Sequence, residues 1–335
     1  MKKNIFTRNF KLAGLLSLVL LASCKKDELE SRELLVFLQP DKPGLATKTQ
    51  IVPFVHNPVA ITGNRIVEVA AAASREVPAE IKVTITPDTK LIPAYNLLNK
   101  TAALELPATA YQVTNGNTHT ISAGSVKSDP IKIEITHPEL LTSTAGYLLP
   151  LTITSIETKD KGVTTSSTHA TVYLLVTYEY NNVATTEIPL TGTLMSRTGW
   201  STTVSNTTSG ALGPAMIDGN NTTSWRSSNS TTAVKWAIIN MGSVQTIKGF
   251  QIVPNYVAVA ENATRMTVST STDNVTWTVQ GTWNGSGPAA TSSATAPDIK
   301  GVNFVAPVAA QYFRFDITAL VSGGRVGFGE VNAIQ

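Results

Sequence analysis

The amino-acid sequence predicts an all-β protein with two β-sandwich domains, and three observations support this prediction. The 335 residues are 42% apolar, which is enough for two domains that each bury a core of their own. Short segments alternate apolar and polar residues with a period of two, as half-buried strands do, and Pro or Gly separates them. Only 15% of the residues are charged, and no stretch is dominated by one sign, which argues against disorder and against a coiled coil.

The first residues have the pattern of an export signal. Basic residues up to Lys11 precede an apolar run at 12–22 that is too short to span a bilayer. The only cysteine is Cys24, and the letters L-A-S-C that end there resemble a bacterial lipobox, in which the chain is cut before a cysteine that then carries a diacylglycerol. This resemblance implies a signal peptide over 1–23 and a lipidated tether over 24–32. The alternative is an ordinary signal peptide with a chance cysteine.

The residues after the cysteine bear on localisation. The run Lys26-Asp27-Glu28 resembles the short signal that sends Bacteroidetes lipoproteins to the cell surface, so it implies a protein anchored in the outer membrane by its lipid and exposed outside. Removal of 1–23 takes away four basic residues and leaves 22 basic against 23 acidic groups, a net charge of −1. A near-neutral chain gives no electrostatic reason to expect nucleic acid as a partner.

The first domain is expected over 33–180, where strand patterns recur about every ten residues and only 93–99 looks like a helical turn. The expected strands are 34–38, 66–69, 81–85, 131–135, 148–153 and 170–178. The letters Y-N-L-L-N at 95–99, I-S-A-G-S at 121–125 and Y-L-L-P-L-T-I at 147–153 resemble a family of lipoprotein β-sandwich domains of undefined function, which precede binding modules in Bacteroidetes. The resemblance implies an immunoglobulin-like spacer and assigns no chemistry to it.

A change of composition near residue 183 indicates a domain boundary. All four histidines lie before this point and all five tryptophans lie after it, and the polar stretch 181–189 is expected to be a linker. The second domain is expected over 190–335. Its predicted strands are 236–241, 246–253, 265–271, 276–280, 312–317 and 326–334.

Five sequence blocks of the second domain resemble coagulation factor five/eight type C (discoidin) domains, which overlap galactose-binding-like carbohydrate modules. The blocks are A-M-I-D-G-N-N-T-T-S-W at 215–225, W-A-I-I-N-M-G at 236–242, S-T-D-N-V-T-W at 271–277, Y-F-R-F at 312–315 and G-E-V at 329–331. They occur in the order found in that family. The resemblance implies a jelly roll of eight strands.

The loop that begins at Asp218 has the composition of a calcium site. A turn of this kind points carbonyl groups inward, and Ca²⁺ binds six to eight oxygen atoms. In the resembled family this loop, closed by a late glutamate, holds a structural Ca²⁺. The resemblance therefore assigns to the ion the side chains of Asp218, Thr223 and Glu330 and the carbonyl of Asn220. The alternative is a metal-free turn with Glu330 in solvent.

Loops at one end of the jelly roll are expected to bind a glycan. A pyranose stacks its C–H face on an aromatic ring, and planar polar groups bind its hydroxyls in pairs. The residues at the family's loop-end positions are Arg226, Asn255, Tyr256, Asn262, Arg325 and Phe328. Arg226 and Asn255 depart from the pattern of galactose binders, so the sugar is not assigned, and loss of the sugar site is the alternative.

The tryptophans are assigned by their place in the strand patterns. Those expected in the core are Trp200, Trp225, Trp236 and Trp277. Trp283 precedes a loop rich in Gly and Pro, so packing in the core and stacking on a ligand are both open for it.

Enzyme signatures are missing from the sequence. The second domain has no histidine for a Ser-His-Asp arrangement, and the chain has no H-E-x-x-H, P-loop or G-x-S-x-G motif. We therefore expect a non-enzymatic surface lipoprotein that captures polysaccharide or host glycoprotein near other surface proteins of glycan uptake. The alternative is an adhesion or structural protein whose C-terminal module binds a protein partner; an uncharacterised hydrolase is a third class.

Overall fold

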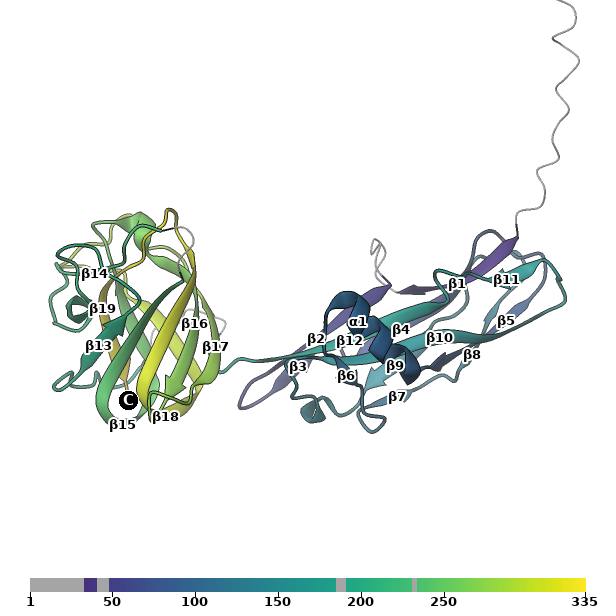
Figure 1. The fold of residues 1–335 in the computed structure, drawn as a ribbon, viewed down its shortest axis with the longest axis horizontal. Coiled ribbons are helices and arrows are strands. Elements are labelled where there is room, and N and C mark those ends of the chain that lie inside the picture. Colours follow the sequence, from purple (N-terminus) through teal and green to yellow (C-terminus); the bar gives the residue numbers. More distant parts are fainter. Residues whose placement is uncertain (1–32, 41–47, 185–190, 231–233) are drawn as a thin grey trace, which may run out of the picture.

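Alternating apolar residues of the first half form strands whose buried faces meet in a two-sheet sandwich, and the second half forms another all-β lobe (Figure 1). The computed structural model describes residues 33–40, 48–184, 191–230 and 234–335. The predicted signal peptide, the tether and Cys24 lie outside the described residues. Within these residues, no helix has the length and apolar character needed to cross a membrane.

The first sandwich confirms the all-β prediction. One sheet has the order β11-β1-β4-β9-β7, and the other has the order β3-β2-β12-β10-β5-β8 with β6 beside β10. The strands are β1 (Leu34–Pro40), β2 (Thr49–His56), β3 (Ile61–Gly63), β4 (Ile66–Ala73), β5 (Ile81–Pro87), β6 (Leu104–Glu105), β7 (Tyr111–Val113), β8 (Thr118–Ile121), β9 (Ile131–Ile135), β10 (Tyr147–Thr158), β11 (Val163–Thr165) and β12 (Thr171–Tyr180).

The core of this sandwich follows directly from the period of two. On β1, Leu34 and Val36 are fully buried whereas Leu35 between them is 36% exposed. The buried faces of β2, β5 and β12 in the other sheet supply the facing side chains, among them Phe54. Each fully buried aliphatic side chain contributes about 1.5–3 kcal/mol relative to exposure, so the alternation determines which face of each strand turns inward.

A short helix, α1 (Ile92–Asn99), lies on the outer face of the second sheet, where the sequence predicts a helical turn (Figure 1). Proline in its first turn suits a helix start, and Lys100 ends it in the left-handed region at φ 54°. The helix buries Ile92 and Tyr95 against Leu148. Beside the helix, β2 and β12 border an open cavity of about 760 Å³.

The second domain is a jelly roll whose strands are longer than predicted. Its strands are β13 (Ser201–Val204), β14 (Trp225–Arg226), β15 (Lys235–Pro254), β16 (Ala263–Ser271), β17 (Thr278–Asn284), β18 (Lys300–Leu320) and β19 (Gly327–Ile334). The order is β14-β19-β15-β18-β16-β17, and β13 also pairs with β15. The family resemblance implied eight strands, and the described residues of this domain form seven. Of these, β13 and β14 were not predicted, and the predicted strands 236–241 and 246–253 belong to one strand. Irregular pairing between Asn240 and Gln245 lets that strand bend instead of ending.

Aromatic residues fill the second core. Phe250 on β15 packs against Phe313 and Phe315 on β18, with ring centroids 4.1 and 5.3 Å apart. Phe328 on β19 continues the cluster to Trp225, at 5.8 Å. All five side chains are at most 1% exposed. Because tilted and edge-on aromatic contacts add to the burial of area, this cluster joins the long strands to the loop end of the domain.

The chain passes between the domains through a buried asparagine. Asn182 is 2% exposed, two residues after β12 ends. Its side-chain amide donates to Oε1 of Gln280 and to the carbonyl of Ala306, both at 3.0 Å, and its Oδ1 accepts from the N–H of Ala306 at 2.9 Å. The start of the segment that the sequence assigns to a linker is therefore bonded to the second domain, because Asn182 finds its partners on β17 and β18.

We expect Asn182→Ala to lower the free energy of unfolding of the second domain by about 2–3 kcal/mol, because buried groups of Gln280 and Ala306 lose their partners. Urea unfolding of the purified protein, followed by tryptophan fluorescence, measures this loss, since all five tryptophans lie in the second domain. Asn284→Ala, at an exposed position, is the matched control and should change little. Equal effects of the two substitutions would contradict the role of Asn182.

Candidate functional site

The loop that was expected to hold calcium forms a tight, internally bonded turn. Gly219 has φ +83°, in the left-handed region that favours glycine. The N–H of Asn220 donates to Oδ1 of Asp218 at 2.8 Å. The hydroxyl of Thr223 lies 2.8 Å from Oδ2 of Asp218 and 2.8 Å from the carbonyl oxygen of Asn220. The turn therefore brings together the three residues that the sequence assigned to it.

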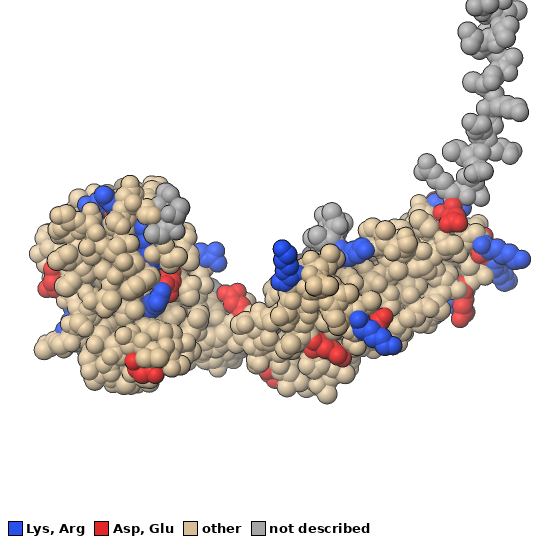
Figure 2. Space-filling model, viewed as in Figure 1, with Lys and Arg blue, Asp and Glu red and all other residues tan. Residues whose placement is uncertain are grey.

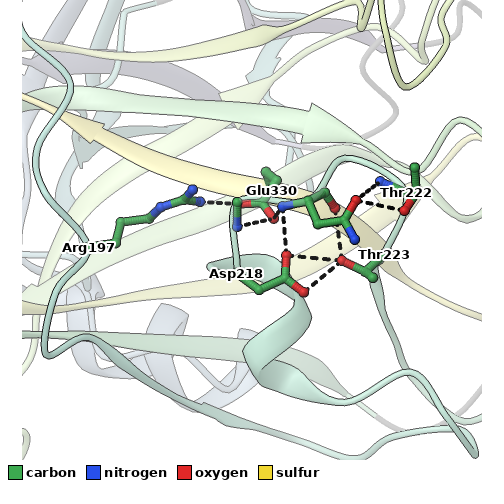
Figure 3. Close-up of polar contacts among 7 residues, drawn as sticks. Arg197, Asp218, Thr222, Thr223 and Glu330 are labelled. Carbon is green, nitrogen blue, oxygen red and sulfur yellow. Dashed lines mark hydrogen bonds and ion pairs between the residues drawn. The ribbon is translucent and has the colours of Figure 1, made fainter.

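Glu330 reaches this turn from β19 and is almost completely buried, with 2% of its surface exposed. Its Oε1 accepts hydrogen bonds from the backbone N–H groups of Gly219 and Asn220, at 3.0 and 3.1 Å. Its Oε2 forms an ion pair with the guanidinium of Arg197 (Figure 3). The alternative prediction of a solvated Glu330 is wrong, because strand β19 holds this side chain inside the domain.

The pKa values of the two carboxyl groups in this cluster are shifted in opposite directions. Burial raises the pKa of Glu330, and the adjacent Asp218 carboxyl raises it further, although Arg197 acts in the other direction. Burial alone would raise the pKa of Asp218, but its contact with Glu330, the hydrogen bonds from Asn220 and Thr223, and the charge of Arg197 together lower it. Carboxylates so close together need a neighbouring cation or a shared proton, and Arg197 is a cation in contact.

These contacts decide how well the residues fit a calcium ion. The hydroxyl of Thr223, the carbonyl of Asn220 and the carboxylate of Asp218 are suitable oxygen ligands and lie close together. Glu330 does not complete this set of ligands. Its Oε1 accepts from two backbone N–H groups, and its Oε2 is paired with the guanidinium of Arg197. Asp218 is then the only carboxylate of the set that is not bound to a guanidinium, so the arrangement does not fit a calcium cage, and the role of Glu330 as a metal ligand is not supported.

At the loop end of the domain, Arg226 on β14 forms a two-point ion pair with Glu261. Its Nε and Nη2 lie 2.6 and 2.5 Å from the two carboxylate oxygens. Hydrogen bonding to Glu261 raises the pKa of Arg226 further above its ordinary value. The Arg226 side chain remains 33% exposed, whereas that of Glu261 is 13% exposed. The pair therefore presents guanidinium N–H groups outward on a fixed support.

Two asparagines expected to contact sugar are part of the scaffold instead. Asn255 is 3% exposed and Asn262 is 4% exposed. Oδ1 of Asn262 accepts from the backbone N–H of Asn255 at 2.7 Å, and its amide donates back to the carbonyl of Asn255 at 2.9 Å. These bonds close the loop between β15 and β16. The prediction that Asn255 and Asn262 contact the ligand is therefore corrected: both side chains support the loop.

The remaining predicted contacts divide between core and surface. Phe328 is 1% exposed and packs on Trp225, so it is a core residue and has no free face for a sugar. Tyr256 and Arg325 are partly exposed. Gly327, two residues after Arg325, pairs with Arg226 across the β14–β19 ladder, so both arginines lie at one end of the domain. The structure thus keeps Arg226, Tyr256 and Arg325 as accessible candidates and adds Glu261.

A comparison with family models agrees with this geometry. Residues 201–331, which contain β13 to β18 and most of β19, match the F5/8 type C domain. The second domain is an F5/8 type C domain. Residues 37–160 match a family described as an N-terminal domain. No curated protein matches the chain.

Solved structures show where the fold of both domains recurs. A two-domain protein of unknown function from Bacteroides fragilis is 16% identical; the match covers 91% of this chain and 95% of that one, with a TM-score of 0.60. An F5/8 type C domain from Bacteroides fragilis is 17% identical over 44% of this chain and 98% of its own, with a TM-score of 0.38. The family 32 CBM of Clostridium perfringens NanJ, solved with galactose, is 18% identical over 43% and 100%, with a TM-score of 0.36.

The tryptophans of the F5/8 type C domain only partly follow their predicted assignment. Trp225 is fully buried and its Nε1 donates to the carbonyl of Asn206 at 3.0 Å. Trp283, left open between packing and ligand stacking, is 3% exposed and belongs to the core. Trp236 and Trp277 are partly exposed and lie outside the core cluster; Trp236 points outward from β15 beneath the guanidinium of Arg314. Trp236 lies on β15 as its strand pattern predicts, but on the exposed face, and Trp277 lies just before β17 begins at Thr278.

Two charged residues of these sites, Arg197 and Glu261, were not predicted from the sequence. Arg197 lies 133 residues from Glu330, and Glu261 lies 35 residues from Arg226. Neither stands in a motif of the F5/8 type C pattern quoted above. Only the fold brings them to their partners, so no local signal could have identified them.

We expect Trp225→Ala to lower the free energy of unfolding of the F5/8 type C domain by about 3–5 kcal/mol, because a large core side chain and its hydrogen bond are lost. Trp277→Ala, which removes a partly exposed tryptophan from the same domain, should cost much less. Thermal unfolding followed by circular dichroism measures both. If the two variants lose equal stability, Trp225 is not the anchor of the loop end.

Proposed function

We propose that this protein binds glycans at the loop end of its F5/8 type C domain and holds them at the bacterial surface through a lipid on Cys24. The binding site in this proposal consists of Arg226, Glu261, Tyr256 and Arg325. The observation that carries it is the two-point ion pair between Arg226 and Glu261, which remains partly exposed where the family's loops gather.

The ion pair suits the chemistry of a sugar. A guanidinium has five N–H groups, and Glu261 engages two of them, so others remain to donate to hydroxyls. The carboxylate beside it accepts hydrogen bonds, so neighbouring hydroxyls of one ring meet a donor and an acceptor together. Tyr256 lies in the same loop as Glu261, and its partly exposed ring offers an aromatic surface for the sugar. The NanJ module was solved with galactose, but that structure assigns no sugar to this chain.

The charge distribution supports an uncharged ligand. Figure 2 shows scattered basic and acidic side chains on the face drawn, without a large patch of one sign. The charged groups of the proposed site neutralise one another in part, because Arg226 is paired with Glu261. Such a surface favours hydroxyl groups over phosphates, so we propose no nucleic-acid partner. We also propose a binding role without catalysis, since the carboxylate at this end is committed to an arginine.

A protein partner is the second candidate, and exposed aliphatic residues favour it. Val257 is 76% exposed, and Val259 and Val321 are each 41% exposed. They lie near Tyr256 and Asn262, since the N–H of Val321 bonds to the carbonyl of Asn262. Apolar side chains grouped at a surface are typical of protein contacts. This candidate is an adhesion or structural protein that uses the same loops.

We expect Arg226→Lys to weaken glycan binding about 10- to 100-fold, because lysine keeps the charge but loses the planar set of donors. A glycan array with the purified protein first identifies a ligand, and titration calorimetry then compares the variants. Arg265→Lys, at an exposed position of the same domain, is the matched control and should bind normally.

The same titrations separate the two candidates. Val257→Ser should leave glycan binding unchanged while it weakens binding to a protein partner, because it removes an exposed apolar side chain from the loop that carries Glu261. Normal binding by Arg226→Lys would contradict the proposed glycan site, whichever sugar the array identifies.

We expect Cys24→Ala to release the protein from the membrane fraction, because no sulfur remains to carry the lipid that the L-A-S-C segment implies. Metabolic labelling with a palmitate analogue and fractionation of the cells measure the change. Labelling of the variant at the level of the natural protein would show that Cys24 is not the lipidated residue.

A further inference from the structure

The ion pair between Arg197 and Glu330 lies where a cation was expected from the sequence. The guanidinium contacts Oε2 of Glu330 inside the domain, and the Arg197 side chain is only 21% exposed (Figure 3). A buried charge pair of this kind is uncommon, because each charge loses its hydration and only close partners can offset that loss. The residues around this ion pair explain its position.

Those residues form a negatively charged group that needs a positive charge. The carboxyls of Asp218 and Glu330 lie close together, because both accept from the backbone N–H of Asn220, at 2.8 and 3.1 Å; Glu330 is buried, whereas Asp218 is exposed. The backbone N–H groups of Gly219 and Asn220 satisfy one oxygen of Glu330 but carry no full charge. Arg197 is the one guanidinium or ammonium group that contacts this pair among the described residues.

The guanidinium also fills the space beside the turn. A Cβ added at Gly219 would lie 3.2 Å from Nη2 of Arg197, so the arginine is packed directly on the backbone of the loop. An ion placed against Glu330 would meet the guanidinium at short range, and two positive charges in one buried site repel each other strongly. The arginine and a bound divalent cation are therefore alternatives for the same place.

We propose that Arg197 is a built-in replacement for the structural cation of this loop, so that the F5/8 type C domain folds and keeps its 218–223 turn without calcium. The covalently attached charge neutralises Asp218 and Glu330 at any external calcium concentration. Removal of the guanidinium leaves two adjacent carboxyls, a hydroxyl and a carbonyl, which is an oxygen set that a divalent cation can bind. The proposal does not depend on the ligand of the loop end.

The test compares melting temperatures of the full chain in EDTA and in about 5 mM Ca²⁺. This concentration is sufficient, because extracellular calcium modules have dissociation constants of about 1 mM or below. The natural protein should melt at the same temperature in both. Arg197→Met, which keeps much of the side-chain volume, should melt about 10 °C lower in EDTA, because Glu330 is left unpaired. Calcium should then raise its melting temperature by several degrees, since only the folded state holds the site.

Three controls make the result specific. Arg197→Lys keeps the charge and should stay indifferent to calcium. Arg314→Met breaks the partly exposed ion pair with Asp316 in the same domain and should gain no calcium response. Asp218→Asn added to Arg197→Met should abolish the response that the single variant gains.

Two results would overturn the proposal. A calcium-dependent melting temperature in the natural protein would mean that an ion, and not Arg197, neutralises the cluster, as the family resemblance implies. An Arg197→Met protein that folds but ignores calcium would mean that the guanidinium replaces no cation. Should Arg197→Met not fold, Arg197→Gln takes its place under the same criteria, and the measurement on the natural protein stands by itself.

Discussion

The burial of the Glu330 carboxylate is the constraint around which the F5/8 type C domain is arranged. A buried charge without partners would cost several kcal/mol, so the structure must bring N–H donors and a positive charge to it. The backbone of Gly219 and Asn220 provides the donors, and Arg197 provides the charge. Three segments far apart in the chain are thereby joined at one point: the residues before β13, the 218–223 turn and β19.

The same physical rule shapes the loop end of the domain. Arg226 is held by Glu261, and Asn262 bonds the backbone of Asn255, so the loop between β15 and β16 is fixed before any ligand arrives. A preformed site spends less free energy on ordering when it binds. The two asparagines consequently matter for the proposed glycan site although they contact no ligand, because they place Glu261 beneath Arg226.

Buried hydrogen bonds also hold the connection between the two domains. The amide of Asn182 donates to Gln280 on β17 and to Ala306 on β18, directly after β12 leaves the first sandwich. The segment entering the F5/8 type C domain is therefore held by buried hydrogen bonds, directly after the last strand of the first sandwich (Figure 1). Such an arrangement suits the proposed role, in which the F5/8 type C domain binds glycans away from a lipid anchor.

The sequence by itself determined the features that depend on neighbouring residues. Period-two alternation identified β1, β5 and β9 and, in the second domain, parts of β15 to β19 but not β13 or β14, because a strand shows its buried face in every second residue. The spacing from Asp218 to Thr223 identified the turn, since Asp and Gly direct the backbone locally. Only the tertiary structure decided which charges meet. Arg197 reaches Glu330, Glu261 reaches Arg226, and Phe328 turns into the core, because long strands bend and pair across more than thirty residues of sequence, and no local pattern records which distant side chain arrives.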